Sequence, residues 1–326
     1  MTPRFHARSR RPRRSAPWLR RTLVAVFFTT WLLGSLGCRA LPNAGNNAGT
    51  GNDAGTGNNA ATSDERRFPV VAELAATVPI SPSNYRPWIP KQARMPSVEF
   101  DGTRVKVHDV RNFDYVTETD HVERFETRNY DLRELESVDY MVVPFPAAPL
   151  LAHTMLSFGF GRGRYLVSSV EARLEQGETY SPLLGGLRQY ELIYVLADER
   201  DALRLRADVR GDDVYIYRVQ APPEKLRDLL VDILDRVNQL RDTPEFYDTL
   251  TNNCTTNIAR HVNRIAPARV PLGSEVLLSG LSPRLIYDLG LLDSSRSFEE
   301  LTLAANASPR IRENRTASDF SDRIRR

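Results

Sequence analysis

The chain has 326 residues, of which 44 are basic, 41 are acidic and two are cysteine. The first 37 residues contain eight arginines and no acidic residue, so the rest of the chain holds 36 basic and 41 acidic residues. The overall basicity therefore belongs to the N-terminal segment, and no nucleic-acid partner is expected. No metal-ligand spacing, phosphate-binding loop or dinucleotide fingerprint occurs in the sequence, so neither a metal nor a cofactor is expected.

Residues 1–37 have the pattern of a secretory signal peptide. The arginine-rich start is followed by an uncharged, largely apolar run at 22–37, which is short for a membrane span. The run ends in the sequence LGSLGC, which resembles a bacterial lipobox and puts the lipid on Cys38. We therefore expect an exported protein of the bacterial periplasm or cell envelope, lipid-anchored to a membrane. The alternative is ordinary cleavage near Ala40 and a soluble exported protein.

A flexible segment follows the signal. Residues 38–66 are rich in Asn, Ala, Gly and Thr, a composition typical of a flexible low-complexity tether. We expect an N-terminal extension at 67–130, with an Asp-Gly hairpin at 98–105, and a catalytic-like domain at 131–294. Strand-like runs lie at 154–160, 165–172, 190–196 and 214–219, and the alternation of apolar and charged residues at 202–209 favours a fifth strand.

Two helices are expected after these strands. Pro222-Pro223 opens the first, whose apolar residues from Leu226 to Leu240 share one face. The second begins near Cys254, directly after a run of helix-capping residues, and ends before Pro267. Residues 295–326 are polar and arginine-rich, and we expect them to form a loosely packed tail.

Cys254 is the only cysteine outside the export segment. In the first turn of a helix, unpaired N–H groups and the helix dipole favour the thiolate, which is the reactive form. If Cys38 carries a lipid, no intramolecular disulfide is possible, and Cys254 is a free thiol in an oxidising compartment. The position is compatible with a nucleophile and also with a small buried hydrophobe.

His153 is the histidine best placed to serve as a base. It opens an apolar strand that is joined to the next strand by Gly161-Arg162-Gly163. With a three-residue loop, residues whose numbers sum to 324 face each other, which puts His153 opposite Glu171 on one face. The expected triad is Cys254 as nucleophile, His153 as base and Glu171 as the carboxylate that orients the imidazole. The alternatives are a hydrogen-bonded strand-end histidine and a surface glutamate paired with Arg173.

Further polar groups are candidates for supporting roles. The backbone N–H groups of Cys254 and Asn253 are expected to hold an oxyanion at the start of the helix. Tyr180 and Arg188 flank the Gly185-Gly186 loop, which either lines a substrate cleft or is an ordinary surface loop.

Several long motifs resemble one family. In order, they are AHTMLSFGF, SVEAR, GETYSPL, RQYELIYVLADERD, VYIYR, PEFYDTLTNNCTTNI and LLSGLSPRLIYDLG, the order typical of the Lnb-type N-terminal periplasmic domain family, across about residues 110–295. That family is named after a bacterial lipoprotein N-acyltransferase. The order of a histidine strand before an Asn-Cys helix is also similar to permuted papain-like enzymes, including lecithin:retinol acyltransferase-like proteins. The resemblance implies Cys254 as nucleophile and His153 as base, in an α+β fold with an antiparallel sheet packed against helices.

Three functions follow as hypotheses. The resemblance implies a membrane-tethered cysteine acyltransferase, in which a thioester at Cys254 carries an acyl chain from a phospholipid donor to a lipoprotein amine. Unlike some members, this chain has no apolar run after residue 40 long enough to span a membrane. A cell-envelope amidase or peptidase is the second hypothesis, since a fold does not choose between these reactions. A non-catalytic envelope lipoprotein is the third.

Overall fold

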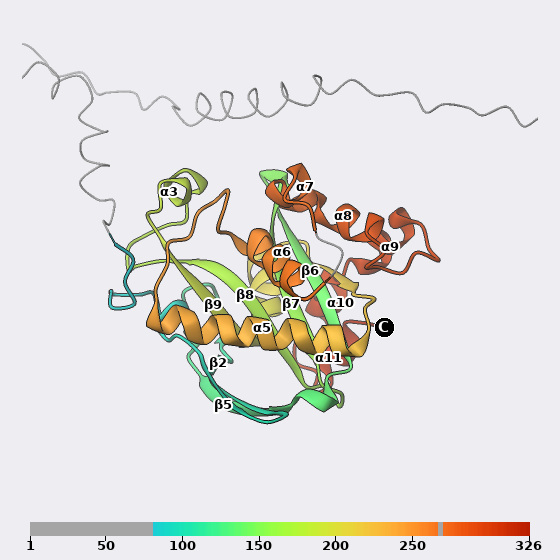
Figure 1. Ribbon diagram of the computed structural model, residues 1–326, viewed down its shortest axis with the longest axis horizontal. Coiled ribbons are helices and arrows are strands. Elements are labelled where there is room, and N and C mark those ends of the chain that lie inside the picture. The colour runs from blue at the N-terminus through green and yellow to red at the C-terminus, as the bar shows by residue number, and fades with distance from the viewer. Residues whose placement is uncertain (1–80, 267–269) are drawn as a thin grey trace, which may run out of the picture. The chain divides into compact units, whose positions relative to one another are not determined.

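The computed structural model describes residues 81–266 and 270–326 (Figure 1). The predicted signal peptide, the lipidation site at Cys38 and the predicted tether lie outside the described residues. Within the described ranges, no helix combines the length and the apolar character needed to cross a membrane.

The described residues form an eight-stranded, mostly antiparallel sheet (Figure 1). Its order is β1-β2-β9-β8-β7-β6-β10, and β5 pairs with β2 beside this path. The contact between β2 and β9 is parallel. The strands are β1 (Ser97–Asp101), β2 (Arg104–Arg111), β5 (Phe125–Asp131), β6 (Ser137–Phe145), β7 (Ala148–Gly159), β8 (Tyr165–Arg173), β9 (Glu191–Asp198) and β10 (Tyr215–Arg218), with β3 (Asp114–Tyr115) and β4 (His121–Val122) forming a separate pair.

Helices cover the sheet and join its strands. The longest is α5 (Pro223–Asp242), which is followed by α6 (Cys254–Ile265). The others are α3 (Pro182–Gly186), α4 (Glu199–Arg204), α7 (Ser274–Leu277), α8 (Ser282–Asp288), α9 (Phe298–Ala305), α10 (Ser308–Glu313) and α11 (Phe320–Arg323), with the short turns η1 (Pro90–Gln92), η2 (Leu132–Glu134), η3 (Leu205–Arg210, π-helical) and η4 (Ser279–Leu281).

The hairpin between β7 and β8 has the predicted register. The Phe160 N–H donates to the Arg164 carbonyl oxygen at 2.9 Å, which closes the three-residue loop. Leu156 pairs with Ser168, and these numbers sum to 324. The register prediction is therefore confirmed, and it fixes which side chains share a face.

The hairpin at 98–105 is confirmed as well. Asp101 pairs with Arg104 at the end of β1, and Gly102 has a φ of 59°. This left-handed conformation favours glycine, which explains why an Asp-Gly pair marks the turn.

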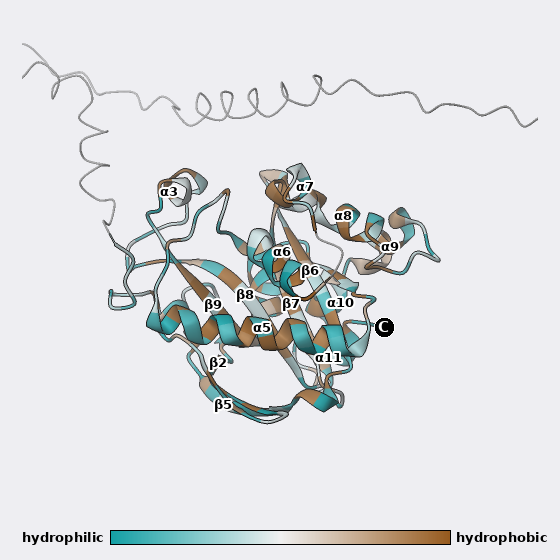
Figure 2. Cartoon of the chain, viewed as in Figure 1, coloured by the Kyte–Doolittle hydropathy of each residue, from teal (hydrophilic) through white to brown (hydrophobic). Residues whose placement is uncertain are grey.

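The two faces of the sheet carry separate cores. Side chains alternate between faces along a strand. Even-numbered residues of β7 and β8, such as Leu156 and Val170, pack in one core with α5 and α6, which cross this face in Figure 1. Odd-numbered residues, such as Met155 and Val167, pack in a second core with α4, α10 and α11. We call these the first and the second face. Figure 2 shows long hydrophobic stretches on β6, β8 and β9, whereas α5 alternates between hydrophobic and hydrophilic residues.

The fifth predicted strand, at 202–209, is wrong. This segment is helical, because α4 continues into the π-helical turn η3. Asp198 caps α4 by accepting a bond from the Arg200 N–H at 2.9 Å. Ala202, Leu203 and Ala207 are buried in the second core. The alternation of apolar and charged residues covers only eight positions. The helix cap at Asp198 and the burial of one helix face determine the structure instead.

The prediction of a loosely packed C-terminal tail is also wrong. Ile311, Phe320 and Ile324 are buried in the second core. The Arg325 guanidinium bonds Asp139 at 2.9 Å and also pairs with Glu199. The sequence analysis missed these buried residues, because only a few apolar residues are spaced among the more numerous arginines of the C-terminal segment.

The expected N-terminal extension is partly continuous with the main sheet. β1, β2 and β5 lie within residues 97–131 and belong to the eight-stranded sheet. Strand β6 was missed by the sequence analysis. The α+β class, with a mostly antiparallel sheet packed against helices, is confirmed. The finer likeness to permuted papain-like enzymes stays a prediction.

Candidate functional site

Cys254 is the first residue of α6. Asn253 is its N-cap and accepts a bond from the Thr256 N–H at 2.9 Å, while the Thr256 hydroxyl accepts one from the Asn253 N–H at 2.8 Å. This reciprocal capping box fixes where the helix begins. The Cys254 side chain is 7% exposed and faces the first core.

The start of α6 leaves two backbone donors without partners. Within residues 81–266 and 270–326, no acceptor lies in hydrogen-bonding position to the N–H of Cys254 or of Thr255. Free N–H groups at a helix start bind negative charge. The predicted oxyanion donor Asn253 is placed differently, because its N–H is already donated to Thr256. The two adjacent amides of Cys254 and Thr255 are therefore the donors that an oxyanion at this site would meet.

The Cys254 thiol lies among carbonyl, hydroxyl and phenol groups. Its Sγ is 3.9 Å from the Ala152 carbonyl oxygen and 3.8 Å from the Thr255 hydroxyl. Tyr180 and Tyr247 pack against the same core, with their hydroxyl oxygens 3.4 Å apart. Burial raises the pKa of both phenols, and the negative charge of a Cys254 thiolate adds to the rise. Both therefore stay protonated near neutral pH, where they can donate a hydrogen bond but cannot take the thiol proton.

The structure does not bring His153 and Cys254 together. Ala152 and Thr154, the even-numbered neighbours of His153, face α6, and the Thr154 and Thr255 hydroxyl oxygens are 3.0 Å apart. Because side chains alternate along β7, His153 points to the second face. The sheet therefore lies between the thiol and the imidazole, and the predicted direct transfer of the Cys254 proton to His153 has no geometric basis here.

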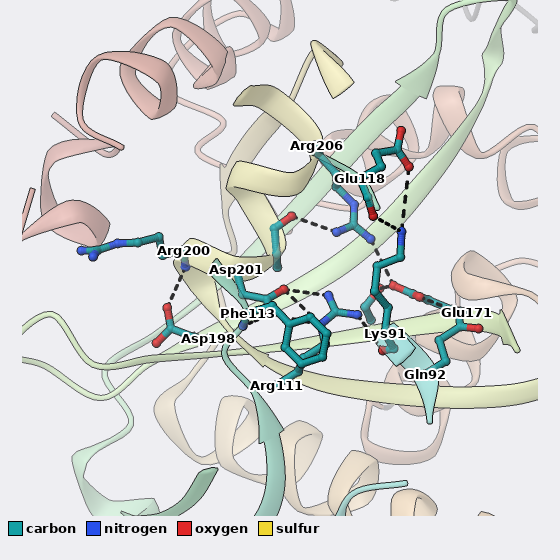
Figure 3. Close-up of polar contacts among 12 residues, drawn as sticks. Lys91, Gln92, Arg111, Phe113, Glu118, Glu171, Asp198, Arg200, Asp201 and Arg206 are labelled. Carbon is teal, nitrogen blue, oxygen red and sulfur yellow. Dashed lines mark hydrogen bonds and ion pairs between the residues drawn. The ribbon is translucent and has the colours of Figure 1, made fainter. Parts of the chain in front are cut away.

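The structure does bring His153 and Glu171 together, through a serine. The His153 Nε2 is 2.8 Å from the Ser169 hydroxyl, which donates to Glu171 at 2.9 Å. Glu171 also accepts bonds from Gln92 at 2.9 Å and from Arg206 at 3.1 Å (Figure 3). Burial would raise the pKa of Glu171, but the Arg206 charge holds it well below its usual range. The predicted alternative partner of Glu171, Arg173, bonds backbone carbonyl groups instead.

Sequence analysis missed Ser169 and Arg206. The register that places His153 opposite Glu171 also places Ser169 on that face, so the signal for Ser169 was present. Arg206 comes from η3, a segment predicted as a strand, and carried no usable signal.

The burial of His153 predicts a pH-dependent stability. Burial lowers its pKa to about 3, and the neighbouring Arg206 charge adds to the effect. An unfolded histidine titrates near pH 6.5, so between that pH and about 3 the unfolded chain binds a proton that the folded protein does not. Stability should therefore fall as the pH drops through this window, by up to about 1.4 kcal/mol per pH unit.

Urea unfolding midpoints across this pH window test the prediction. His153→Gln should flatten the slope, while His261, whose pKa burial lowers to about 4, leaves part of it in place. An unchanged slope in His153→Gln would show that the imidazole does not resist protonation in the folded protein.

The other predicted residues lie near the start of α6. Arg188 lines a pocket of about 370 Å³ together with Glu245, Asp248, Asn252 and Arg260. Tyr180 is not part of its lining and packs against Tyr190 and Tyr247 instead. A polar pocket therefore lies beside the residues that precede Cys254. No group of three or more His, Cys, Asp or Glu side chains in the described part of the chain is arranged to hold a metal.

Comparison with known families gives one match. Residues 121–280 match the family model of the Lnb N-terminal periplasmic domain. The matched range contains β7, β8 and α6, and therefore His153, Glu171 and Cys254. No curated protein and no solved structure gives a significant match.

Proposed function

We propose that this protein is an acyltransferase of the cell envelope that forms a thioester on Cys254. The match of residues 121–280 to the Lnb N-terminal periplasmic domain supports this proposal. The acyl chain comes from a phospholipid and passes to the amine of a lipoprotein. The lipid anchor at Cys38 and membrane tethering are part of the same proposal. The observation that carries it is the position of the thiol at the start of a 12-residue helix, directly beside two amides that bind no acceptor in the described part of the chain.

The chemistry balances without a cofactor. The Cys254 sulfur attacks the ester carbonyl of the donor, a C–S bond forms and the C–O bond breaks, and the thiol proton ends on the released alcohol. The amine then attacks the thioester, a C–N bond forms, the C–S bond breaks, and an amine proton returns to sulfur. In both steps the amides of Cys254 and Thr255 stabilise the oxyanion. His153 takes no direct part, since it lies on the second face of the sheet.

Exposed leucines on both sides of Cys254 support a lipid substrate. On one side, η4 packs on β7 next to Ala152, and Leu277 and Leu281 nearby are exposed. On the other side, α3 packs against Tyr247 and carries the exposed Leu183. In Figure 1, α3 and α7 rise at the same end of the sheet, with α6 between them. Apolar side chains around a thiol suit an acyl chain better than a charged peptide.

The polar pocket beside Asn252 favours a second candidate, an amidase or peptidase. Its charged lining, which includes Arg188, Asp248 and Arg260, would suit a polar substrate. In that case water, rather than an amine, resolves the thioester.

Intact mass of the purified protein after incubation with mixed bacterial phospholipids tests the proposal. We expect a hydroxylamine-labile acyl adduct on the wild-type protein and on His153→Ala, and none on Cys254→Ala. An adduct that persists in Cys254→Ala would place the acyl group elsewhere and refute the proposal. A wild-type thiol that alkylates rapidly but gains no acyl group would favour the amidase.

A further inference from the structure

A second pocket lies on the second face of the sheet, far from Cys254. Its volume is about 410 Å³. Cys254 contacts Ala152 near the start of β7, whereas the pocket reaches Gly163 in the turn after β7. At roughly 3.3 Å per residue, the strand alone separates the two sites by on the order of 25 Å. A ligand here is therefore not the acyl group attacked by Cys254.

Three carboxylates line this pocket, and each of them is paired with an arginine. The pairs are Asp114 with Arg204 at 2.7 Å, Asp198 with Arg128 at 2.8 Å and Glu199 with Arg325 at 2.8 Å. Each carboxylate of the lining thus has a cationic partner, while Arg204 and Arg128 also bind Asp208 and Glu126, which do not line the pocket.

Three other arginines of the lining make no ion pair with a carboxylate of the described residues. Arg124, Arg200 and Arg315 line it, and no carboxylate of the described ranges lies within 4.0 Å of their guanidinium groups. They come from the β4–β5 connection, from α4 and from the segment before α11, so only the fold brings them together. The lining therefore carries more positive than negative charge.

Arg200 also has a donor without an acceptor. One of its terminal nitrogens donates to the Ala317 carbonyl oxygen, and its guanidinium lies 5.4 Å from the centre of the Phe320 ring. Its buried Nε has no hydrogen-bond partner among the residues that the structure describes. Figure 3 shows its guanidinium pointing away from the Arg111–Asp201 pair, while its backbone N–H binds Asp198. A buried donor of this kind is unfavourable, and the Nε is too enclosed to meet a ligand, so the terminal nitrogens of Arg200 are the ones that can donate to a ligand.

Hydroxyl groups complete the lining. Thr316, Ser318 and Ser321 face the pocket, and their hydroxyls make no hydrogen bond to other described residues. Guanidinium and hydroxyl donors together match the terminal oxygens of a phosphate, which carries two charges and three strong acceptors. We infer that this pocket binds a phosphate monoester, with Arg124, Arg200 and Arg315 on its oxygens.

Two sources can present this phosphate, a soluble ester or the headgroup of a lipid such as phosphatidic acid. Titration calorimetry on the full chain separates them. One arm uses sodium phosphate and glycerol 3-phosphate, and the other uses phosphatidylcholine vesicles with and without phosphatidic acid. Saturable binding of glycerol 3-phosphate without binding to vesicles identifies a soluble ester. Binding confined to phosphatidic acid vesicles identifies a lipid. Either result supports the proposed site, provided that the arginine variants described next weaken the binding.

The double variant R124Q/R315Q is the main test. Both side chains are exposed and make no ion pair with a described residue, so the protein should keep its fold. It should weaken binding at least tenfold, as expected when charged hydrogen bonds to the ligand are lost. R104Q, which removes an exposed charge from β2 outside the pocket, should change binding less than about twofold. Undetectable binding of every probe, or wild-type affinity in R124Q/R315Q, would overturn the inference.

Discussion

Replacing Asp201 with alanine should lower the free energy of unfolding by about 3–5 kcal/mol. The Asp201 side chain is 0% exposed and accepts bonds from the Arg111 guanidinium at 2.8 and 3.1 Å (Figure 3). It also accepts one from the Phe113 N–H at 2.6 Å. Burial lowers the pKa of Arg111 and the Asp201 charge raises it, so the variant removes the partner that stabilises the cation. A guanidinium nevertheless stays protonated in proteins, even when it is buried. The variant therefore leaves a buried, unpaired cation.

Urea denaturation gives the measurement, with Asp288→Ala as the matched control. Asp288 pairs with Arg284 at 3.0 Å one helical turn away, and both side chains are more than half exposed. Losing this pair should cost at most about 0.5 kcal/mol. If Asp201→Ala and Asp288→Ala unfold at similar urea concentrations, the buried Arg111–Asp201 pair does not stabilise the packing of α4 on β2.

The hairpin register and the helix start at the candidate site could be predicted from the sequence, because each depends on a local sequence pattern. A three-residue loop sets the register of the β7–β8 hairpin, and that register correctly puts His153 and Glu171 on one face. The capping residues before Cys254 likewise identify the start of α6 within one residue. Each of these predictions depends on residues that are near one another in the chain.

The placement of Cys254 and His153 on opposite faces of the sheet could not be predicted in the same way. Register says that His153 and Thr154 point to opposite faces, but it does not say which face a helix 100 residues later will cover. That choice depends on how α5 and α6 pack as a layer, and they bury the even-numbered face that includes Ala152 and Thr154. His153 therefore marks the start of β7 as the sequence predicts, but it does not lie beside Cys254.

The second face holds most of the buried charge, while the first face holds the thiol. On the second face, His153 is linked through Ser169 to Glu171, which also bonds Arg206. Glu171 and Arg206 lie close to the Arg111–Asp201 pair (Figure 3). Buried charges are costly unless they are paired, so this network requires its helices to dock in one position. The network contacts β7 on the second face through His153, and β7 also supplies the Ala152 carbonyl group that contacts Cys254 on the first face. We therefore expect substitutions on the second face to act on the site through the position of β7.

The C-terminal segment should prove essential for stability, although its sequence resembles a solvated tail. Ile311 on α10 is 0% exposed and packs with Phe320 and Ile324 against the second face. Ile311→Ala should cost about 2–5 kcal/mol, because a buried aliphatic side chain loses both its transfer free energy and its packing. Thermal or urea unfolding of the full chain measures the effect.

Leu303→Ala is the matched control, because it removes a similar aliphatic side chain from the same segment. Leu303 on α9 is 81% exposed, so its loss should change stability by no more than about 0.5 kcal/mol. Equal, small effects of both substitutions would mean that residues 295–326 dock weakly. Such weak docking would also remove Arg315 and Ser321 from the phosphate pocket, so this pair of variants tests the support of that pocket independently of any ligand.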